Sequence, residues 1–389
     1  MRAVSPWAFD KQLTEVFMPV EFIGYIGNFN ASETIARSGP IVDRNHIAAA
    51  AAIHENGGFD RVLLAFHSTS PESILVGQYV TSITRNLKLM IAHRPGFTAP
   101  TLAARQLATL NHLSDGRVSV HIITGGNDQE LAQDGDHLTK DERYARTSEY
   151  LDIVRQEWTS EKPFDYDGKY YRVTGGFSEV KPQGLDGIPI YFGGSSDAAI
   201  AVAGKHADIY ALWGETYAQV SQTIQRIRAA AASHGRSPRF SLSLRPILAE
   251  TEEEAWAKAD RILQRAKALR ASGERLISVN AKSGSGQPPN EGSRRLLAAA
   301  AQGARLDKRL WTEIAALTGA AGNSTSLVGT PDQVADAMLD YYGLGVTTFL
   351  IRGFDPLEDA FRYGRDLIPR VRTLVAARDR AAPHVQAAE

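Results

Sequence analysis

A short stretch near the middle of the sequence, IPIYFGGSSDAAI (188–200), could bind an anion. Its apolar run indicates a strand, and Gly193, Gly194, Ser195 and Ser196 then lead into an alanine-rich helix. The first turn of a helix leaves backbone N–H groups without partners, and the two serine hydroxyls add further donors. A phosphate would therefore bind well here. The same residues would equally form a helix cap without any ligand.

Polar side chains also follow the other strand-like runs of the sequence. These residues are His67, Ser70, His93, Arg94, Thr124, Trp213, Glu215, Ser243, Arg245, Arg352 and Phe354. The set is rich in hydrogen-bond donors and cations and poor in carboxylates. It lacks the carboxylate pair of a glycosidase, and no HxH or HExxH spacing indicates zinc, so we predict no metal site.

Four of these residues have both a functional and a structural interpretation. Arg245 and Arg352 could bind an oxyanion, because a guanidinium presents forked donors and stays charged; each could instead form a salt bridge at the rim of the fold. His67 could move a proton near neutral pH, or simply be a hydrogen-bond partner in a loop. Trp213 could form the wall of a substrate cavity or pack in a core. Arg94 is expected to be structural.

Strand-like and helix-like segments alternate through most of the chain. The expected strands are 20–27, 61–66, 87–92, 117–124, 188–194, 207–214, 239–249 and 346–353. Several are continuously apolar, as parallel strands buried on both faces must be. Such alternation predicts an α/β protein with a (β/α)8 TIM barrel. In these barrels the catalytic residues lie at the carboxyl ends of the strands, which is where the polar residues above fall.

Three segments interrupt the alternation. Residues 161–173 contain Asp167-Gly168 between aromatic-rich flanks and indicate a β-hairpin. The sequence SGSGQPPNEGSRR (283–295) opens a Gly/Pro/Ser-rich part of an insertion at about 272–327, which we expect to overhang the C-terminal face of the barrel as a lid. We therefore expect an N-terminal extension (1–19), one barrel domain (20–375) and a C-terminal tail (376–389).

Composition excludes several classes of protein. The formal net charge is -1, from 43 basic and 44 acidic residues, which is unlike a nucleic-acid binder. There is no cysteine, which excludes disulfides, thiolate metal sites and a cysteine nucleophile. Asp128, Glu130 and Asp134 are expected to form a solvated acidic face. We find no run of ~20 apolar residues that could span a membrane, and the first residues lack the basic-then-apolar order of a signal peptide. We therefore expect a cytoplasmic protein without a membrane partner.

Four blocks of the sequence resemble a known family. They are residues 94–126 (RPGFTAPTLAARQLATLNHLSDGRVSVHIITGG), 134–158 (DGDHLTKDERYARTSEYLDIVRQEW), 191–215 (YFGGSSDAAIAVAGKHADIYALWGE) and 327–360 (LVGTPDQVADAMLDYYGLGVTTFLIRGFDPLEDA). The chain from about residue 20 to 370 resembles the bacterial-luciferase-like flavin monooxygenases. It is most similar to the FMNH2-dependent alkanesulfonate monooxygenases.

The resemblance implies a luciferase-like barrel that receives reduced FMN (FMNH2) from a separate NAD(P)H-dependent flavin reductase. With O2, such an enzyme cleaves the C–S bond of an organosulfonate to give sulfite and an aldehyde. A homodimer or homotetramer is also implied. By position, the resemblance assigns FMN binding to His93, Thr124, Tyr144, Gly194, Ser195 and Ser196. We expect catalytic roles for His67, Arg245 and Trp213, and substrate binding by Ser70, Ser243, Arg352 and Phe354.

The chain also departs from the alkanesulfonate pattern. Ser70 stands where those enzymes carry a cysteine, Ser243-Leu244-Arg245 replaces an Arg-x-His, and Phe354-Asp355-Pro356 replaces a Tyr-x-His. The alkanesulfonate enzymes carry an arginine in a mobile loop, and the corresponding position in this chain lies near Thr318. A substrate of another shape, such as an aromatic sulfonate or a sugar sulfonate like sulfoquinovose, is therefore at least as plausible as a simple alkanesulfonate. The alternatives are a deazaflavin-dependent hydride-transfer enzyme of the same fold and a non-catalytic flavin-binding barrel.

Overall fold

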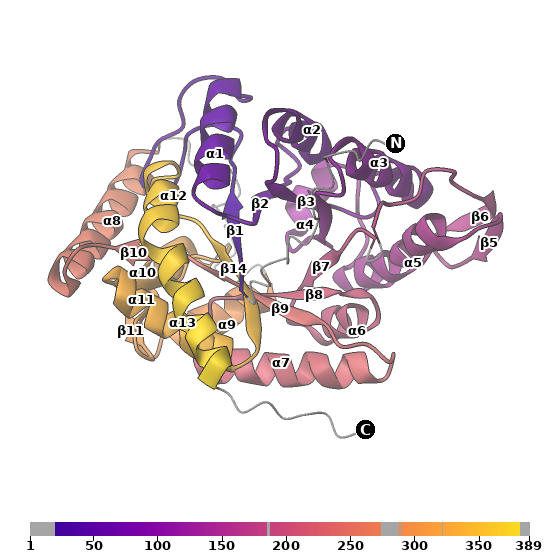
Figure 1. Cartoon of the computed structure of the whole chain (residues 1–389). Coiled ribbons are helices and arrows are strands. Elements are labelled where there is room, and N and C mark those ends of the chain that lie inside the picture. Colours follow the sequence, from indigo (N-terminus) through magenta and orange to yellow (C-terminus); the bar gives the residue numbers. More distant parts are fainter. Residues whose placement is uncertain (1–19, 185–186, 274–287, 289, 321, 382–389) are drawn as a thin grey trace, which may run out of the picture.

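The centre of the molecule is a closed barrel of eight parallel strands (Figure 1). The computed structural model describes residues 20–184, 187–273, 288, 290–320 and 322–381. The strand order around the barrel is β1-β14-β9-β8-β7-β4-β3-β2. The barrel strands are Glu21–Tyr25 (β1), Arg61–Leu64 (β2), Lys88–His93 (β3), Val118–Ile122 (β4), Ile190–Gly193 (β7), Ile209–Trp213 (β8), Arg239–Leu244 (β9) and Val346–Ile351 (β14). Each overlaps an expected strand, with β3 running one residue beyond the expected 87–92, so the predicted (β/α)8 fold is confirmed.

Helices surround the barrel and cover its outer face (Figure 1). They are Arg44–Asn56 (α1), Ser73–Ile83 (α2), Pro100–Leu113 (α3), Asp128–Gln133 (α4), Lys140–Thr159 (α5), Asp197–His206 (α6), Tyr217–Ala232 (α7), Glu252–Ser272 (α8), Pro331–Gly343 (α11), Glu358–Arg362 (α12) and Ile368–Ala381 (α13), with a π-helical turn at Tyr363–Leu367 (η2). Within the described part of the chain, no helix combines the length and the apolar character that crossing a membrane requires.

The apolar residues of the strands are divided between two cores. Outward-facing side chains such as Val62, Leu89 and Val120 pack against the helices in the main cluster. Inward-facing Ile23 and Met90 belong to a smaller cluster within the barrel. Because side chains alternate along a strand, most barrel strands supply both cores, whereas β4 and β9 contribute only to the main cluster. The small inner core forms a floor, above which the polar residues of the strand ends are free to line a cavity.

The predicted hairpin is present. Phe164–Asp167 (β5) and Arg172–Gly176 (β6) pair antiparallel, with Gly168 in the turn between them. The carboxylate of Glu149 accepts backbone N–H groups of Lys169, Tyr170 and Tyr171, which holds the turn against α5. The hairpin lies on the opposite side of the barrel from α8 (Figure 1).

The expected strand at 239–249 is broken in two. β9 ends at Leu244, and Ile247–Leu248 (β10) leaves the barrel to pair with Ser326–Gly329 (β13). Pro246 stands at the break, where it lacks the N–H that a continuing ladder would need. Arg305–Leu306 (β11) and Leu310–Trp311 (β12) complete a four-stranded sheet in the order β10-β13-β12-β11. This sheet and α8 enclose a separate hydrophobic core.

The insertion expected at about 272–327 is more regular than its composition indicates. Its described part contains helices Glu291–Ala300 (α9) and Glu313–Thr318 (α10) as well as strands of the small sheet. Asn290 caps α9 by accepting the N–H of Ser293, so the Gly/Pro/Ser-rich character ends where a helix begins. Most of 283–290 and the extension at 1–19 lie outside the described residues.

Residues 376–381, which were expected to belong to a C-terminal tail, are part of α13, and residues 382–389 lie outside the described part of the chain. α13 continues to Ala381 because its last turns are tied to α11. The guanidinium of Arg378 donates to the carbonyl of Leu339, and the hydroxyl of Tyr342 donates to the carboxylate of Asp379. The expected boundary at residue 376 therefore falls inside a helix.

Candidate active site

A cavity of about 370 Å³ lies at the carboxyl ends of β2, β3, β4, β7 and β8. We call it the strand-tip cavity. Its size falls in the range of about 300–1,000 Å³ that is usual for small-molecule sites. The predicted site residues that line it are His67, Thr124, Tyr144, Gly194, Ser195, Ser196 and Trp213. Residues from five separate strand ends are thus brought to one space.

The turn after β7 requires glycine. Gly194 has φ +133°, a conformation that other residues rarely adopt. A Cβ at this position would lie 2.8 Å from Cβ of Ala199 and 2.9 Å from Oη of Tyr144. The hydroxyl of Tyr210 donates to the Gly194 carbonyl at 2.5 Å and fixes the turn from the neighbouring strand. The turn leaves Ser195 and Ser196, which directly precede α6, facing the cavity.

Ser195 and Ser196 have different positions at the start of α6. Ser196 is the N-cap, and its hydroxyl accepts the N–H of Ala199 at 3.3 Å. Ser195 lines the cavity, and its hydroxyl has no hydrogen-bond partner within the described part of the chain. The carboxylate of Asp197 is 97% exposed and forms an ion pair with Arg226 at 2.6 Å. Its negative charge is therefore compensated outside the cavity.

Two further donors complete this end of the cavity. Burial raises the pKa of Tyr144, so its hydroxyl stays protonated at neutral pH. Lys140 begins α5 and brings an ammonium group to the lining. Hydroxyls, an ammonium group and a helix N-terminus around a turn too tight for a Cβ suit a phosphate group. The donor set therefore fits the phosphate of FMN.

β4 contributes one predicted and one unpredicted residue to the lining. Thr124 follows the strand, is 7% exposed and lies 3.4 Å from the hydroxyl of Thr147. His121 also lines the cavity, and burial lowers its pKa to about 4, so the imidazole is neutral at pH 7. Its Nδ1 has no partner among the residues described. Strand alternation could have identified His121 from the sequence. In VSVHI it lies two residues after Ser119, so both side chains point to the same face of β4.

The loop after β2 places His67 beside a buried ion pair. Nδ1 of His67 lies 3.7 Å from Oε1 of Glu130, and Glu130 pairs with Arg94 at 2.8 Å. Burial would raise the pKa of Glu130, but hydrogen bonds from His67 and Arg94 lower it to about 2. The predicted solvated face is thus wrong for Glu130, which is 9% exposed because the start of α4 turns it toward Arg94. Ser70 only shapes this loop, accepting the His67 N–H at 2.9 Å.

The start of α9 covers the cavity. Asn290, Glu291 and Gly292 line it, and a Cβ on Gly292 would lie 2.9 Å from the ring of Trp213. Arg295 of α9 holds Glu215, which follows β8, through two contacts of 2.7 and 2.6 Å. The inserted helix is therefore seated directly on the barrel rim.

His93 is not brought to the cavity. Its neighbour Ala92 lines the space, so strand alternation turns His93 outward toward α5. There its Nε2 lies 2.7 Å from Oη of Tyr150, and burial lowers its pKa to about 4. Ser243 is also outside the lining. Its carbonyl and hydroxyl accept the side-chain amide of Asn323, which closes the top of the barrel between β8 and β9.

The two predicted arginines share one carboxylate. Nη1 of Arg245 lies 2.8 Å from Oε1 of Glu33, and Nη2 of Arg352 lies 3.4 Å from the same atom. The salt bridge that was the alternative interpretation of these arginines is therefore formed. The guanidinium of Arg245 also stacks on the ring of Phe354 at 3.6 Å. No sequence pattern identified Glu33, which lies in the irregular segment between β1 and α1.

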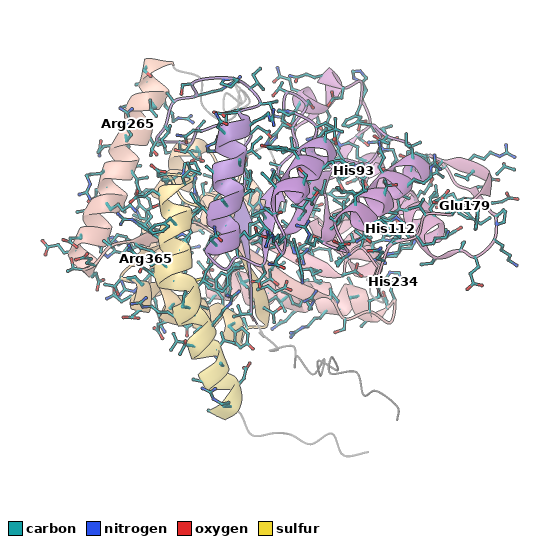
Figure 2. The ribbon with its side chains drawn as sticks, turned by 45° about the horizontal axis from the view of Figure 1, so that its top comes forward. His93, His112, Glu179, His234, Arg265 and Arg365 are labelled. Carbon is teal, nitrogen blue, oxygen red and sulfur yellow. The ribbon has the colours of Figure 1, made fainter. Side chains whose placement is uncertain are left out.

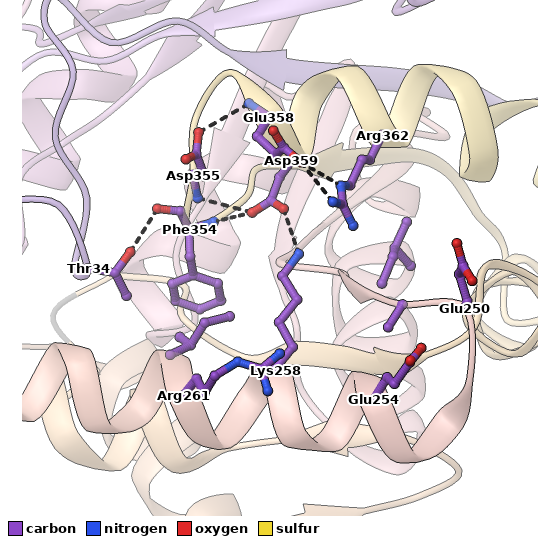
Figure 3. Close-up of a pocket in the computed structure, with 13 residues that line it drawn as sticks. Thr34, Glu250, Glu254, Lys258, Arg261, Phe354, Asp355, Glu358, Asp359 and Arg362 are labelled. Carbon is purple, nitrogen blue, oxygen red and sulfur yellow. Dashed lines mark hydrogen bonds and ion pairs between the residues drawn. The ribbon is translucent and has the colours of Figure 1, made fainter.

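Phe354 forms part of a second pocket of about 810 Å³ (Figure 3). This pocket lies between α8 and the turn from β14 to α12, outside the strand-tip cavity. Lys258 reaches across it to Asp359 at 3.0 Å. In the part of the chain that is described, no group of three or more His, Asp or Glu side chains could hold a metal ion.

The barrel fold agrees with the comparison to known families. The family model described as luciferase-like monooxygenase matches residues 20–348. The chain belongs to this family. A luciferase-like flavin-dependent monooxygenase must hold a flavin, and the strand-tip cavity has the donors that a flavin phosphate needs.

Solved structures with the same barrel have several activities. A riboflavin lyase, solved with modified FMN and riboflavin, is 19% identical over 93% of this chain and 92% of its own, with a TM-score of 0.73. EDTA monooxygenase from Chelativorans sp. BNC1 is 20% identical over 92% and 94%, with a TM-score of 0.69. The coenzyme F420-dependent tetrahydromethanopterin reductase from Methanopyrus kandleri is 18% identical over 90% and 99%, with a TM-score of 0.62. These low identities establish a shared fold.

Proposed function

We propose that this protein is a two-component monooxygenase that uses reduced FMN and O2 to cleave the C–S bond of an organosulfonate, giving sulfite and an aldehyde. One observation carries the flavin part of the proposal: Ser195, Tyr144 and Lys140 converge with the start of α6 at one end of the strand-tip cavity. A separate NAD(P)H-dependent flavin reductase would supply the reduced FMN.

Different residues of the cavity bind different parts of the cofactor. Reduced FMN, when bound, supplies the two electrons that allow O2 to be activated. Ser195, Ser196 and the N–H groups of α6 hold its phosphate, with Tyr144 donating from α5. Thr124 and the neutral imidazole of His121 face the part of the ligand that lies over β4. The start of α9 and Trp213 exclude water from above, which limits wasteful reduction of O2.

His67 is the proposed proton carrier. Its side chain is 49% exposed, so it can exchange protons with solvent. Glu130, held ionised by Arg94, lies within reach of Nδ1 and favours an orientation in which Nε2 is free. The roles of Ser70 and Ser243 are then indirect, because each shapes the backbone next to the cavity.

The sulfonate part of the proposal depends on Arg245 and Arg352. Arg352 lies over the ring of Tyr25 at 5.5 Å, and Tyr25 is paired in register with Leu63, which lines the cavity. The two guanidinium groups are therefore one strand away from the proposed flavin site. Paired guanidinium groups are suited to an oxyanion, and one next to the flavin would hold the substrate in position for oxidation.

Binding of reduced FMN and release of sulfite together test the proposal. The protein would be titrated anaerobically with reduced FMN and, in parallel, with a reduced deazaflavin. O2 uptake and sulfite release would then be followed with alkyl, aryl and sugar sulfonates. We expect micromolar binding of reduced FMN and sulfite in proportion to O2 used with at least one sulfonate. Reduced FMN that bound no more tightly than millimolar would refute the flavin assignment.

We also propose that the protein works in the cytoplasm as a homodimer or homotetramer. The outward face of α2 supports self-association, because the sequence of this helix, SILVGQYVTSI, contains no charge. Leu75 and Ile83 of this helix are 72% and 43% exposed. Exposed apolar side chains on an uncharged helix are typical of a buried interface. Light scattering after size-exclusion chromatography would give the state, and a monomer at micromolar concentration would refute it.

A further inference from the structure

Glu33, Arg245 and Arg352 form a cluster at the end of the barrel strands β9 and β14, which we call the arginine cluster; Arg245 is buried, and the side chains of Arg352 and Glu33 are 25% and 19% exposed. Arg245 is 1% exposed; its Nη2 donates to the Gly353 carbonyl at 2.8 Å and its Nη1 contacts Glu33. Burial alone would raise the pKa of Glu33, but the charges of the two arginines lower it to about 2. The carboxylate is therefore ionised at any physiological pH.

The arginine cluster is not neutral. Two guanidinium groups face one carboxylate, which leaves one positive charge without compensation. The nearby carboxylate of Asp359 accepts the N–H groups of Phe354 and Asp355 and pairs with Lys258 (Figure 3). Nε of Arg245 and Oε2 of Glu33 have no hydrogen-bond partner in the described part of the chain. Because Arg352 and Glu33 are partly exposed, the excess positive charge can be reached from solvent, and a further anion would be favoured there.

The space at the arginine cluster is too small for a second anion while Glu33 is present. A void of about 20 Å³ borders Tyr25, Arg245 and Arg352, which is room for about one water molecule. A sulfonate or carboxylate group of a ligand could therefore bind the two arginines only where the Glu33 carboxylate now lies.

Glu33 lies in a segment without regular secondary structure. This segment, between β1 and α1, has no helix or strand from residue 26 to 43. The hydroxyl of Thr34 donates to the Phe354 carbonyl at 3.0 Å (Figure 3). The Thr34 carbonyl accepts the Nε–H of Arg265 at 3.3 Å, and the N–H of Ser32 donates to the Ile35 carbonyl at 3.0 Å. Moving the segment breaks these hydrogen bonds and leaves the barrel ladder intact.

We propose that Glu33 is an internal counter-ion occupying an anion-binding site made by Arg245 and Arg352, and that a singly charged oxyanion on the substrate displaces it. Glu33 then sets specificity: only a group that pairs with both arginines better than the carboxylate does gains entry, and a neutral substrate leaves the site closed. The inference rests on the proposed function only in taking the oxyanion to belong to the substrate.

The Glu33→Gln variant tests the displacement, because it keeps the side-chain shape and removes the competing charge. Binding of methanesulfonate and of acetate would be measured by calorimetry on the full chain without flavin. We expect the variant to bind at least one of them about tenfold or more tightly than the unaltered protein does. The preferred probe shows whether the site suits a tetrahedral or a planar oxyanion. Unchanged affinity for both would overturn the proposal.

Two variants control this measurement. Glu358→Gln removes a carboxylate that pairs with Arg362 near the second pocket, outside the arginine cluster, and should leave anion affinity unchanged. Adding Arg352→Gln to Glu33→Gln should abolish the gain. A gain that persisted in the double variant would place the anion elsewhere and contradict the assignment.

A measurement on the unaltered protein covers the case in which the variants do not fold. Hydrogen exchange of residues 28–40 should increase in saturating methanesulfonate, because the anion releases Glu33 and its segment. Sodium chloride at equal ionic strength is the control. No increase would overturn the displacement. Binding of reduced FMN, measured separately, tests the flavin assignment, so the two proposals fail independently.

Discussion

At the scale of single residues, the chemistry of this protein is concentrated where strands end. Most side chains within the barrel strands face the apolar inner core or the helices. Two or three residues after the strands end, the chain carries Ser195, Thr124 and His67. Local sequence was therefore enough to select residues that line one cavity, and their binding of a phosphate stays a prediction. Local sequence was not enough for Glu33 or Glu130, whose roles depend on arginines far away in the chain.

Replacing Ser195 with alanine should weaken the binding of reduced FMN without affecting stability. Its hydroxyl makes no hydrogen bond among the described residues, so only donation to the ligand is lost. A hydrogen bond to a charged group contributes about 1–3 kcal/mol. Ser196→Ala is the matched comparison: it should weaken FMN and also lower the melting temperature, because it removes the cap of α6. Titration and thermal melts of both variants would show this, and equal melting losses would contradict the distinction.

Replacing Gly194 with alanine should both destabilise the protein and block the flavin site. The new Cβ would meet Ala199 and Tyr144 in a turn that already has positive φ. An alanine forced to positive φ costs about 1 kcal/mol or more. Gly235→Ala supplies the strain alone, because Gly235 has φ +64° and open space around its Cβ position. We expect Gly194→Ala to lose FMN binding and more stability; losses no greater than those of Gly235→Ala would refute the steric explanation.

At the scale of elements, the sequence predicted what local pattern determines. The barrel strands are recognisable because a strand between the inner core and the helices is apolar on both faces. The small sheet was not predicted, since β10, β11 and β12 have two residues each and exist only through pairing with β13 and α8. α9 was obscured by the Gly/Pro/Ser-rich sequence before it. Its position over the cavity depends on Arg295 and Trp213, which no local signal connects.

Breaking the ion pair between Arg295 and Glu215 should release α9 from the barrel rim. Arg295→Gln leaves a carboxylate that is 4% exposed without its partner, a change that costs up to about 3–5 kcal/mol in buried pairs. We expect a lower melting temperature and less product formed per O2 consumed, because water gains access from above. Arg294→Gln is the control, since its pair with Glu291 is exposed and contributes little. Unchanged coupling in Arg295→Gln would show that α9 does not seal the cavity.

At the scale of the whole molecule, stability is tied to pH through buried imidazoles. Burial lowers the pKa of His54, His93 and His121 to about 4 and that of His206 to about 3. Each of these imidazoles packs against its neighbours or lines the cavity in its neutral form. The ring of His54, for example, fills the space next to Gly24. Figure 2 labels His93 together with His112 and His234, which lie in exposed positions on the outer helices and turns. His93, by contrast, is 6% exposed, and this burial lowers its pKa.

The free energy of unfolding should therefore fall as the pH drops from about 6.5 to 4. In that window the unfolded chain binds protons at these histidines and the folded chain does not, so acid favours unfolding. One pKa unit corresponds to about 1.4 kcal/mol, which makes the loss on the order of 3 kcal/mol for each histidine by pH 4. Urea unfolding at pH 7.5, 6.5 and 5.5 would measure it. His206→Gln removes one of these buried groups and should reduce this dependence; an unchanged slope would show that burial of His206 does not contribute to the acid sensitivity.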